Sequence, residues 1–303
     1  MIRTDGLTKE FGKNLAVDNL NLEIHEGEVF GFLGPNGAGK TTTIRMLASL
    51  IGPTRGSATV NGFKIGVEDK QIRKTVGVLT ETPGMYDNLT AEQNLRIFAE
   101  LYDVKDVSGQ VEKYLKMLDL WERRYDTAGT FSKGMKQKLA IARALIHEPR
   151  VLFLDEPTAG LDPEAAHLLR DFIADLKKQG RTIFLCTHNL DEADKLCDRI
   201  AVFKTRLLVM DTPANLRNSI FGRKIVFHLQ SVNEEMIETL RKFAFVKEAK
   251  VIENKIIVTL DDPDKQNPEL IRALVYTGAN LRFIGELRHS LEEVYLQLVQ
   301  SEN

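Results

Sequence analysis

The chain has 303 residues and a formal net charge of −2, and 43% of its residues are hydrophobic, which is ordinary for a globular protein. One hydrophobic core rarely grows beyond about 250 to 300 residues, so this length predicts two domains. The sequence pI of about 6.3 argues against a nucleic-acid-binding protein, for which a pI above about 9 is usual.

The cysteines and the N-terminus indicate the compartment. Cys186 and Cys197 stand without metal-ligand spacing around them, which predicts buried free thiols in a reducing compartment. Residues 1–6 lack the apolar core of a signal peptide, and no stretch approaches the roughly 20 apolar residues of a membrane-spanning helix. We therefore expect a cytoplasmic protein that does not itself cross a membrane.

The first strands are predicted from alternation. Leu20, Leu22 and Ile24 alternate with polar residues, which is the period of a half-buried strand, so the opening segment is predicted to be antiparallel β. Phe11 and Val17 are predicted to contact ATP, with Phe11 a candidate to stack on the adenine ring. An ordinary core or surface phenylalanine is the alternative.

A glycine-rich stretch, residues 34–42, lies between the apolar run 29–33 and a helical pattern over 43–50. This order predicts a phosphate-binding P-loop, because the loop N–H groups can wrap phosphates while the helix N-terminus adds partial positive charge. In such a loop Lys40 reaches the β- and γ-phosphates and the Thr41 hydroxyl can ligate Mg²⁺. A glycine-rich turn without a ligand is the alternative, and the flanking strand and helix argue against it. The predicted ATP contacts are Asn36, Gly37, Ala38, Gly39, Lys40, Thr41 and Thr42.

The next segment contains a hairpin and a strand. Asn61-Gly62 is a strong two-residue hairpin signal. Residues 75–79 are predicted to form a strand, which is followed by Glu81 and ends where Pro83 and Gly84 stop regular structure.

Residues 85–146 are predicted to form a mostly helical subdomain. Thr90 and Gln93 have the spacing of a capping box, and a second helix is expected over about 108–118. Ser132 takes the N-cap position of a helix whose apolar face includes Met135 and Leu139. A cap with no further role is the alternative for Ser132, since serine is among the commonest caps.

The apolar run 151–154 is followed directly by Asp155 and Glu156. This pattern predicts a buried parallel strand with carboxylates at its C-terminal end, where ligands bind in open α/β sheets. Asp162 is predicted to cap a helix that stops at Gly180, and the strand 182–186 comes next. His188 follows that strand, where a surface histidine would be unremarkable by itself.

Past about residue 217 the pattern changes, which predicts domains over 1–218 and 219–303. The predicted elements spell βαββαβ, as in a small ferredoxin-like sandwich: strand 224–229, helix 234–243, strands 246–252 and 255–260, helix 268–277 and strand 281–284. Ser290 and Glu293 then have the spacing of a capping box for a last helix that ends near residue 299.

With the P-loop, the stretch 131–135, the stretch 154–162 and His188 in this order, the chain resembles the ATPase subunit of an ABC transporter over residues 2–217. The resemblance implies an α/β P-loop NTPase fold of ABC type. Such a fold has a mixed-sheet core, an antiparallel β subdomain and a helical subdomain, here about residues 85–146. A small α+β domain would follow it in this chain.

The resemblance also implies roles for the site residues in ATP hydrolysis. Asp155 would help to hold Mg²⁺, Glu156 would polarise the attacking water, and His188 would contact the γ-phosphate with Lys40. Phosphoryl transfer needs this combination of charge neutralisation and a positioned water more than it needs covalent chemistry. Ser132 and Gly134 match the signature sequence, whose helix N-terminus would face the γ-phosphate bound by a second subunit. Leu161 and Asp162 would form the D-loop, and Asp162 is a further expected ATP contact.

Three positions depart from the commonest family pattern. Phe11 stands where many members have tyrosine. The signature sequence reads Phe-Ser-Lys-Gly-Met, so Lys133 adds a cation near the phosphates. Glu81 falls where the family usually has a glutamine, which would add a third carboxylate beside Asp155 and Glu156 at the metal.

The tail 219–303 resembles the C-terminal domain of drug- and multidrug-exporter ATPases, so export is favoured over import. The expected partners are a separate integral membrane permease and a second ATPase subunit, with the protein peripheral on the inner face of the cell membrane and no nucleic acid bound. The alternative is a soluble ABC-type ATPase that acts on nucleic acid or ribosomes. Such proteins carry two cassettes or a long inserted coiled coil, and this chain shows neither. A regulatory protein without turnover is opposed by Glu156, the intact candidate base.

Overall fold

The computed structural model describes residues 1–82, 84–287 and 289–300; Pro83 of the predicted loop and Arg288 of the tail lie outside the described residues. The chain divides into two compact units, Met1–Thr212 and Pro213–Asn303. The predicted domain boundary at residue 218 lies further along, inside the helix α8 (Pro213–Phe221).

One sheet of unit 1 is antiparallel, as predicted for the opening segment. Its strand order is β2-β1-β4-β5, formed by β1 (Ile2–Phe11), β2 (Asn14–Ile24), β4 (Arg55–Val60) and β5 (Phe63–Lys64). The predicted hairpin at Asn61-Gly62 is present, and both residues have positive φ, 55° and 83°. Leu20, Leu22 and Ile24 are buried, as the alternation predicts.

The other sheet of unit 1 is mixed and has six strands in the order β10-β9-β3-β8-β7-β6. The strands are β3 (Val29–Leu33), β6 (Val76–Leu79), β7 (Val151–Asp155), β8 (Thr182–Thr187), β9 (Arg199–Lys204) and β10 (Arg206–Asp211). Only the pair of β9 and β10 is antiparallel. The carboxyl ends of the parallel strands meet at one edge, so the segments after β3, β6, β7 and β8 lie together there.

Aromatic side chains fill the core behind these strands. Phe30, Phe32, Phe153, Phe184 and Phe203 are fully buried, and the Phe32 and Phe203 ring centroids lie 4.6 Å apart. Burial of each ring stabilises the fold by roughly 1.5–3 kcal/mol, which holds the strand ends in a fixed arrangement. Both cysteines are buried and free, as predicted.

The helices of unit 1 outside the helical subdomain are α1 (Lys40–Leu47), α2 (Asp69–Thr75), α6 (Pro163–Lys178) and α7 (Leu190–Leu196). The predicted helix after the P-loop starts at Lys40, earlier than expected. The helix α2 is missing from the predicted elements, and it includes Thr75, which was expected to begin a strand. Only Ile72 is buried in α2, so the sequence there carries no apolar period that would reveal a helix.

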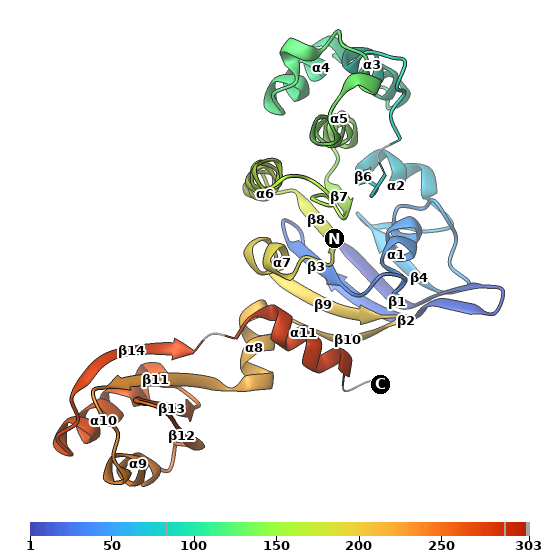
Figure 1. Cartoon of the computed structure of the whole chain (residues 1–303). Helices are drawn as coiled ribbons and strands as arrows, with labels where there is room; N and C mark the ends of the chain where they lie inside the picture. Colours follow the sequence, from blue (N-terminus) through green and yellow to red (C-terminus); the bar gives the residue numbers. More distant parts are fainter. Residues whose placement is uncertain (83, 288, 301–303) are drawn as a thin grey trace. The chain divides into compact units, whose positions relative to one another are not determined.

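Residues 85–146 are mostly helical, as predicted, and α3 (Ala91–Leu101), α4 (Val107–Met117) and α5 (Lys133–Leu145) gather at one end of unit 1 (Figure 1). Two short 3₁₀ helices, η1 (Trp121–Arg123) and η2 (Ala128–Thr130), connect α4 to α5. The capping box is formed, because Gln93 N donates to Thr90 Oγ1 at 3.1 Å and Thr90 N donates to Gln93 Oε1 at 2.9 Å. Ser132 caps α5 by accepting from Met135 N at 3.2 Å.

Unit 2 has the predicted βαββαβ order between its first and last helices, α8 and α11 (Leu291–Gln300). The elements are β11 (Arg223–Leu229), α9 (Glu234–Arg241), β12 (Glu248–Ile252), β13 (Lys255–Leu260), α10 (Pro263–Tyr276) and β14 (Leu281–Leu287). The strands form an antiparallel sheet in the order β12-β13-β11-β14. The comparison with a ferredoxin-like sandwich stays a prediction.

The start of one helix of unit 2 lies five residues before its predicted position. α10 begins at Pro263, whereas the sequence suggested Pro268, which lies inside the helix. Proline suits the first helical position because an N–H there would have no intrahelical partner, and Pro263 takes that position.

The capping box before α11 is formed, since Glu293 N donates to Ser290 Oγ at 3.2 Å and Ser290 N donates to Glu293 Oε2 at 3.1 Å.

Over the described part of the chain, no helix is both long enough and apolar enough to span a membrane.

Candidate functional site

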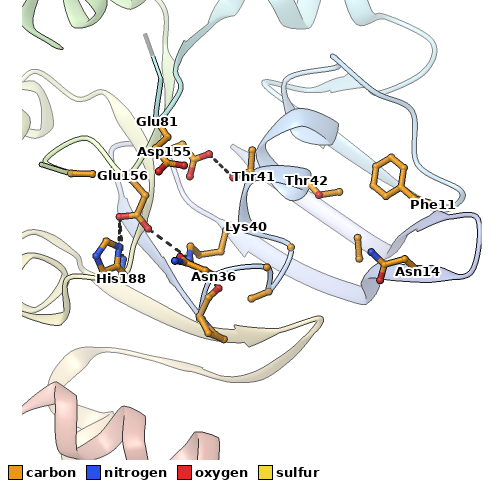
Figure 2. Close-up of a pocket in the computed structure, with 16 residues that line it drawn as sticks. Phe11, Asn14, Asn36, Lys40, Thr41, Thr42, Glu81, Asp155, Glu156 and His188 are labelled. Carbon is orange, nitrogen blue, oxygen red and sulfur yellow. Dashed lines mark hydrogen bonds and ion pairs between the residues drawn. The ribbon is translucent and has the colours of Figure 1, made fainter. Parts of the chain in front are cut away.

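A cavity of about 460 Å³ opens at the carboxyl edge of the six-stranded sheet, and Figure 2 shows the residues around it. It brings together twelve of the predicted site residues, which come from segments far apart in the sequence. These residues are Phe11, Asn36, Gly37, Ala38, Gly39, Lys40, Thr41, Thr42, Glu81, Asp155, Glu156 and His188.

Two glycines of the loop are required by the chain itself. Gly39 precedes α1 with φ 104°, and a Cβ there would lie 2.1 Å from the Ala16 carbonyl oxygen. A Cβ on Gly34 would lie 2.2 Å from the Phe203 carbonyl oxygen. The nearest atoms to both Cβ positions are backbone carbonyl oxygens of this chain. Gly37, with φ 79°, has nothing within 4 Å of its Cβ position and so faces open space.

Lys40 places a buried cation beside the loop. Its Nζ donates to the carbonyl oxygens of Gly34 at 2.7 Å and Pro35 at 3.3 Å, and lies 3.7 Å from Glu156 Oε1. The residue is only 7% exposed, and a buried ammonium group is costly unless it has such partners. Because two partners are neutral carbonyls, the positive charge is only partly compensated, and an anion in the cavity would be attracted to it.

Thr41 and Asp155 place a hydroxyl beside a carboxylate. Thr41 Oγ1 donates to Asp155 Oδ2 at 2.6 Å. Burial raises the pKa of Asp155, whereas the hydrogen bond from Thr41 and the charge of Lys40 oppose the rise. The described residues contain no group of three or more His, Cys, Asp or Glu that could hold a metal by itself. Mg²⁺ is commonly bound by one or two carboxylates together with substrate phosphates and water, so this donor pair fits that ion.

Glu156 sits in a strained position directly after β7. Its φ is 51°, a left-handed conformation that costs a non-glycine residue about 1–2 kcal/mol. Its N–H donates to the Cys186 carbonyl oxygen at 2.9 Å, which holds the backbone in place. Glu156 Oε2 lies 2.8 Å from His188 Nδ1, while the buried Oε1 has no hydrogen-bond partner among the described residues. One carboxyl oxygen is therefore held by His188, and the other, which faces Lys40 at 3.7 Å, keeps its lone pairs for a further hydrogen bond.

Phe11 and Asn14 lie at the end of the cavity opposite His188, where the adenine ring is expected (Figure 2). Phe11 is 50% exposed there, at the end of β1, with Lys9 Nζ 5.1 Å from its ring centroid. Asn14 also lines the cavity and was missed by the sequence analysis. Only the strand register reveals Asn14, because it is paired with Phe11 across the hairpin and belongs to no motif.

Val17 was predicted to contact ATP, and the structure corrects this. Val17 is fully buried in the core, and Ala16 lines the cavity in its place. Successive side chains of a strand point to opposite faces, so residues 16 and 17 cannot both face the nucleotide.

Ser132, Gly134 and Asp162 lie outside this cavity. Ser132 and Asp162 are the exposed N-caps of α5 and α6, and Gly134 lies in the first turn of α5. Gly134 lines a separate, mainly apolar cavity of about 210 Å³ together with Leu161. Within one copy of the chain, these residues therefore do not meet the nucleotide cavity.

Comparisons with known proteins agree with this geometry. A sequence model of the family described as ABC transporter matches residues 17–159. A bacitracin transport ATP-binding protein of Bacillus licheniformis is 35% identical, covering 99% of this chain and 97% of its own length. A linearmycin resistance ATP-binding protein of Bacillus subtilis is 30% identical, covering 98% of each chain. A dimeric ATP-binding cassette solved in a post-hydrolysis state with ADP and Pi is 26% identical, with a TM-score of 0.64 over 70% of this chain and 98% of that one.

Proposed function

The chain belongs to the ATP-binding proteins of ABC transporters, and we propose that two copies of it power export through a separate membrane permease. It has the P-loop fold of an ABC ATPase, binds ATP and hydrolyses it. The observation that carries the proposal is the carboxyl group of Glu156, whose Oε2 contacts His188 and whose Oε1 is paired with Lys40 but has no hydrogen-bond partner among the described residues.

The chemistry follows from the positions of these side chains. The loop N–H groups and Lys40 would bind the phosphates, and Phe11 would stack on the base. Thr41 and Asp155 would hold Mg²⁺, which neutralises charge on the β- and γ-phosphate oxygens during transfer. Glu156 would orient the attacking water and accept its proton through Oε1, because that oxygen has no hydrogen-bond partner among the described residues. His188 would hold the other carboxyl oxygen and contact the γ-phosphate.

The second copy supplies the remaining contacts in this proposal. Ser132, Lys133 and Gly134 begin α5, and the N-terminus of a helix attracts anions. Because these residues and Asp162 lie outside the cavity of their own chain, we infer that they close over the nucleotide of the partner. The dimeric form of the ADP- and Pi-bound cassette supports this arrangement.

The proposed direction of transport and the proposed location of the protein are inferred from its relatives. The named relatives act in bacitracin transport and linearmycin resistance, which supports export of an antibiotic-like compound. We propose a cytoplasmic position, with the protein held at the inner face of the membrane by its permease. The ATPase domain would span 1–218, and 219–303 would be an accessory domain.

Glu156→Gln tests the proposal. We expect this variant to bind ATP with wild-type affinity but to lose hydrolysis by at least about a hundredfold, because a neutral amide cannot accept the proton of water. With Mg²⁺ and ATP, it should accumulate as a dimer on size exclusion, whereas wild type should not. A Glu156→Gln variant that hydrolyses ATP normally would exclude Glu156 as the base, and a variant that stays monomeric would argue against the two-site dimer.

A further inference from the structure

A buried carboxyl group lies behind His188, outside the nucleotide cavity. Glu192 of α7 is only 1% exposed, and burial raises the pKa of its carboxyl group. Burying a carboxyl group costs free energy that an apolar side chain would not cost. Such costs are expected at functional sites, so the contacts of Glu192 indicate what it does there.

Glu192 determines which hydrogen bonds the Thr187 hydroxyl makes. Thr187 Oγ1 donates to Glu192 Oε2 at 2.9 Å, and the same Oγ1 accepts from Asn189 N at 3.0 Å. A hydroxyl has one proton to donate. Thr187 donates its proton in the hydrogen bond to the Glu192 carboxyl oxygen, so its lone pairs remain to accept from Asn189 N. Glu192 N also donates to Asn189 Oδ1 at 3.1 Å.

These bonds fix the backbone on both sides of His188. In an ordinary capping box the third residue of a helix would reach the N-cap N–H directly, whereas here the Thr187 hydroxyl lies between them. The His188 side chain is 64% exposed, so packing does not hold it. Its N–H lies 3.3 Å and its Nδ1 2.8 Å from Glu156 Oε2, and both distances depend on the backbone at 187–189.

We propose that Glu192 is a positioning residue for ATP hydrolysis, which holds His188 against Glu156 through the hydroxyl of Thr187. This inference rests on the proposed roles of Glu156 and His188. It predicts that kcat depends on a hydrogen-bond acceptor at residue 192 and does not depend on a negative charge there. Nucleotide binding should be spared, because Glu192 and Thr187 do not line the cavity.

The test compares variants that remove the acceptor with variants that keep it. In the full chain with Mg²⁺ and ATP, Glu192→Ala and Thr187→Val should each lower kcat by roughly tenfold or more, since small misplacements of catalytic groups have effects of this size. KM should change by less than about twofold. Glu192→Gln keeps an acceptor oxygen for Thr187 and should retain kcat. The double variant should be no slower than Thr187→Val, because Thr187→Val already removes the hydrogen bond to Glu192.

A matched control lies at the other end of the same strand. Thr182 begins β8, is fully buried and accepts from Gly27 N at 2.9 Å. Thr182→Val removes a hydroxyl of the same kind, so it should lower the melting temperature while kcat stays at the wild-type value. A loss of kcat in Thr182→Val equal to that in Thr187→Val would mean that only general destabilisation is being measured.

Hydrogen exchange gives a readout that does not depend on turnover. The amides of His188 and Asn189 should exchange faster in Glu192→Ala and Thr187→Val but not in Glu192→Gln, because their hydrogen bonds would open more often. Unchanged exchange with wild-type kcat in Glu192→Ala would overturn the proposal, and so would a Glu192→Gln variant as slow as Glu192→Ala. If Glu156→Gln still hydrolyses ATP, the proposed role of Glu156 fails. If Glu156→Gln is inactive while Glu192→Ala and Thr187→Val keep the wild-type kcat, the inference about Glu192 fails and the proposed role of Glu156 stands.

Discussion

The charge of Asp155 has opposite effects on stability and on the proposed chemistry. Its folded-state pKa is raised above the ordinary value of 3.8, mainly by burial. The folded protein therefore binds more protons than the unfolded chain between the two pKa values, and stability falls as pH rises through this window. At neutral pH the ionised carboxylate opposes folding, although it is the group that would bind Mg²⁺.

We therefore expect Asp155→Asn to raise the free energy of unfolding at neutral pH while it abolishes hydrolysis. The asparagine oxygen can still accept from Thr41, so the local geometry is preserved. Urea unfolding at neutral pH and at about pH 3 checks this, and the gain should shrink at the lower pH, because below the ordinary value of 3.8 the wild-type carboxyl becomes protonated in both states. A destabilised Asp155→Asn variant at neutral pH would contradict the interpretation.

Glu81 is the site residue whose role depends most on its charge. It is exposed, lines the cavity, and its charge contributes to the raised pKa of Asp155. We propose that it joins Asp155 at the metal, so Glu81→Gln should weaken the apparent Mg²⁺ affinity severalfold, on the order of 1 kcal/mol, and leave Mg²⁺-free ATP binding unchanged. ATPase rates titrated with Mg²⁺ at fixed ATP measure this effect. Superimposable titration curves for Glu81→Gln and wild type would remove Glu81 from the metal site.

At the scale of elements, α5 is tied to two loops that lead to the cavity. Gln137 is buried, and its Nε2 donates to the Pro157 carbonyl oxygen at 2.7 Å, one residue past Glu156. Arg143 Nη1 donates to the Gly84 carbonyl oxygen at 2.6 Å, in the loop that carries Glu81. The helix α5 is therefore hydrogen-bonded to the segment that follows Glu156, the candidate catalytic base, and to the loop that carries Glu81, the candidate metal ligand.

Gln137→Ala should lower the free energy of unfolding by about 1–3 kcal/mol, because it leaves the buried Pro157 carbonyl without its donor. Urea denaturation measures the change, and Gln71→Ala on the exposed side of α2 is the control, expected within about 0.5 kcal/mol of wild type. Equal stability of the Gln137→Ala and Gln71→Ala variants would show that water replaces this bond.

At the scale of the whole molecule, every residue that lines the nucleotide cavity belongs to unit 1. A chain that ends at Thr212 should therefore fold and bind ATP with an affinity within about twofold of the full chain. Thermal unfolding and nucleotide titration of the two chains check this. A folded truncated chain that fails to bind ATP would show that unit 2 contributes to the site.

The sequence determined those features that depend on local chemistry. The glycine loop before Lys40, the caps at Thr90, Ser132 and Asp162, and the buried strand before Asp155 were predicted correctly. Each is specified within a few residues, by a cap side chain, a glycine with positive φ or an apolar period. The order of the motifs was sufficient to identify the family, and the P-loop, Asp155, Glu156 and His188 meet at one cavity.

Only the tertiary structure decided features that depend on contacts between distant segments. Ala16 replaces Val17 at the cavity because strand register, which no local pattern fixes, sets which face each residue takes. Asn14 faces the base end through its pairing with Phe11, and Gly34 is required by the carbonyl of Phe203, far along the chain. The link from Glu192 through Thr187 to His188 was likewise invisible in the sequence, since a glutamate in the first turn of a helix is ordinarily a solvated residue, and only the packing of α7 buries it.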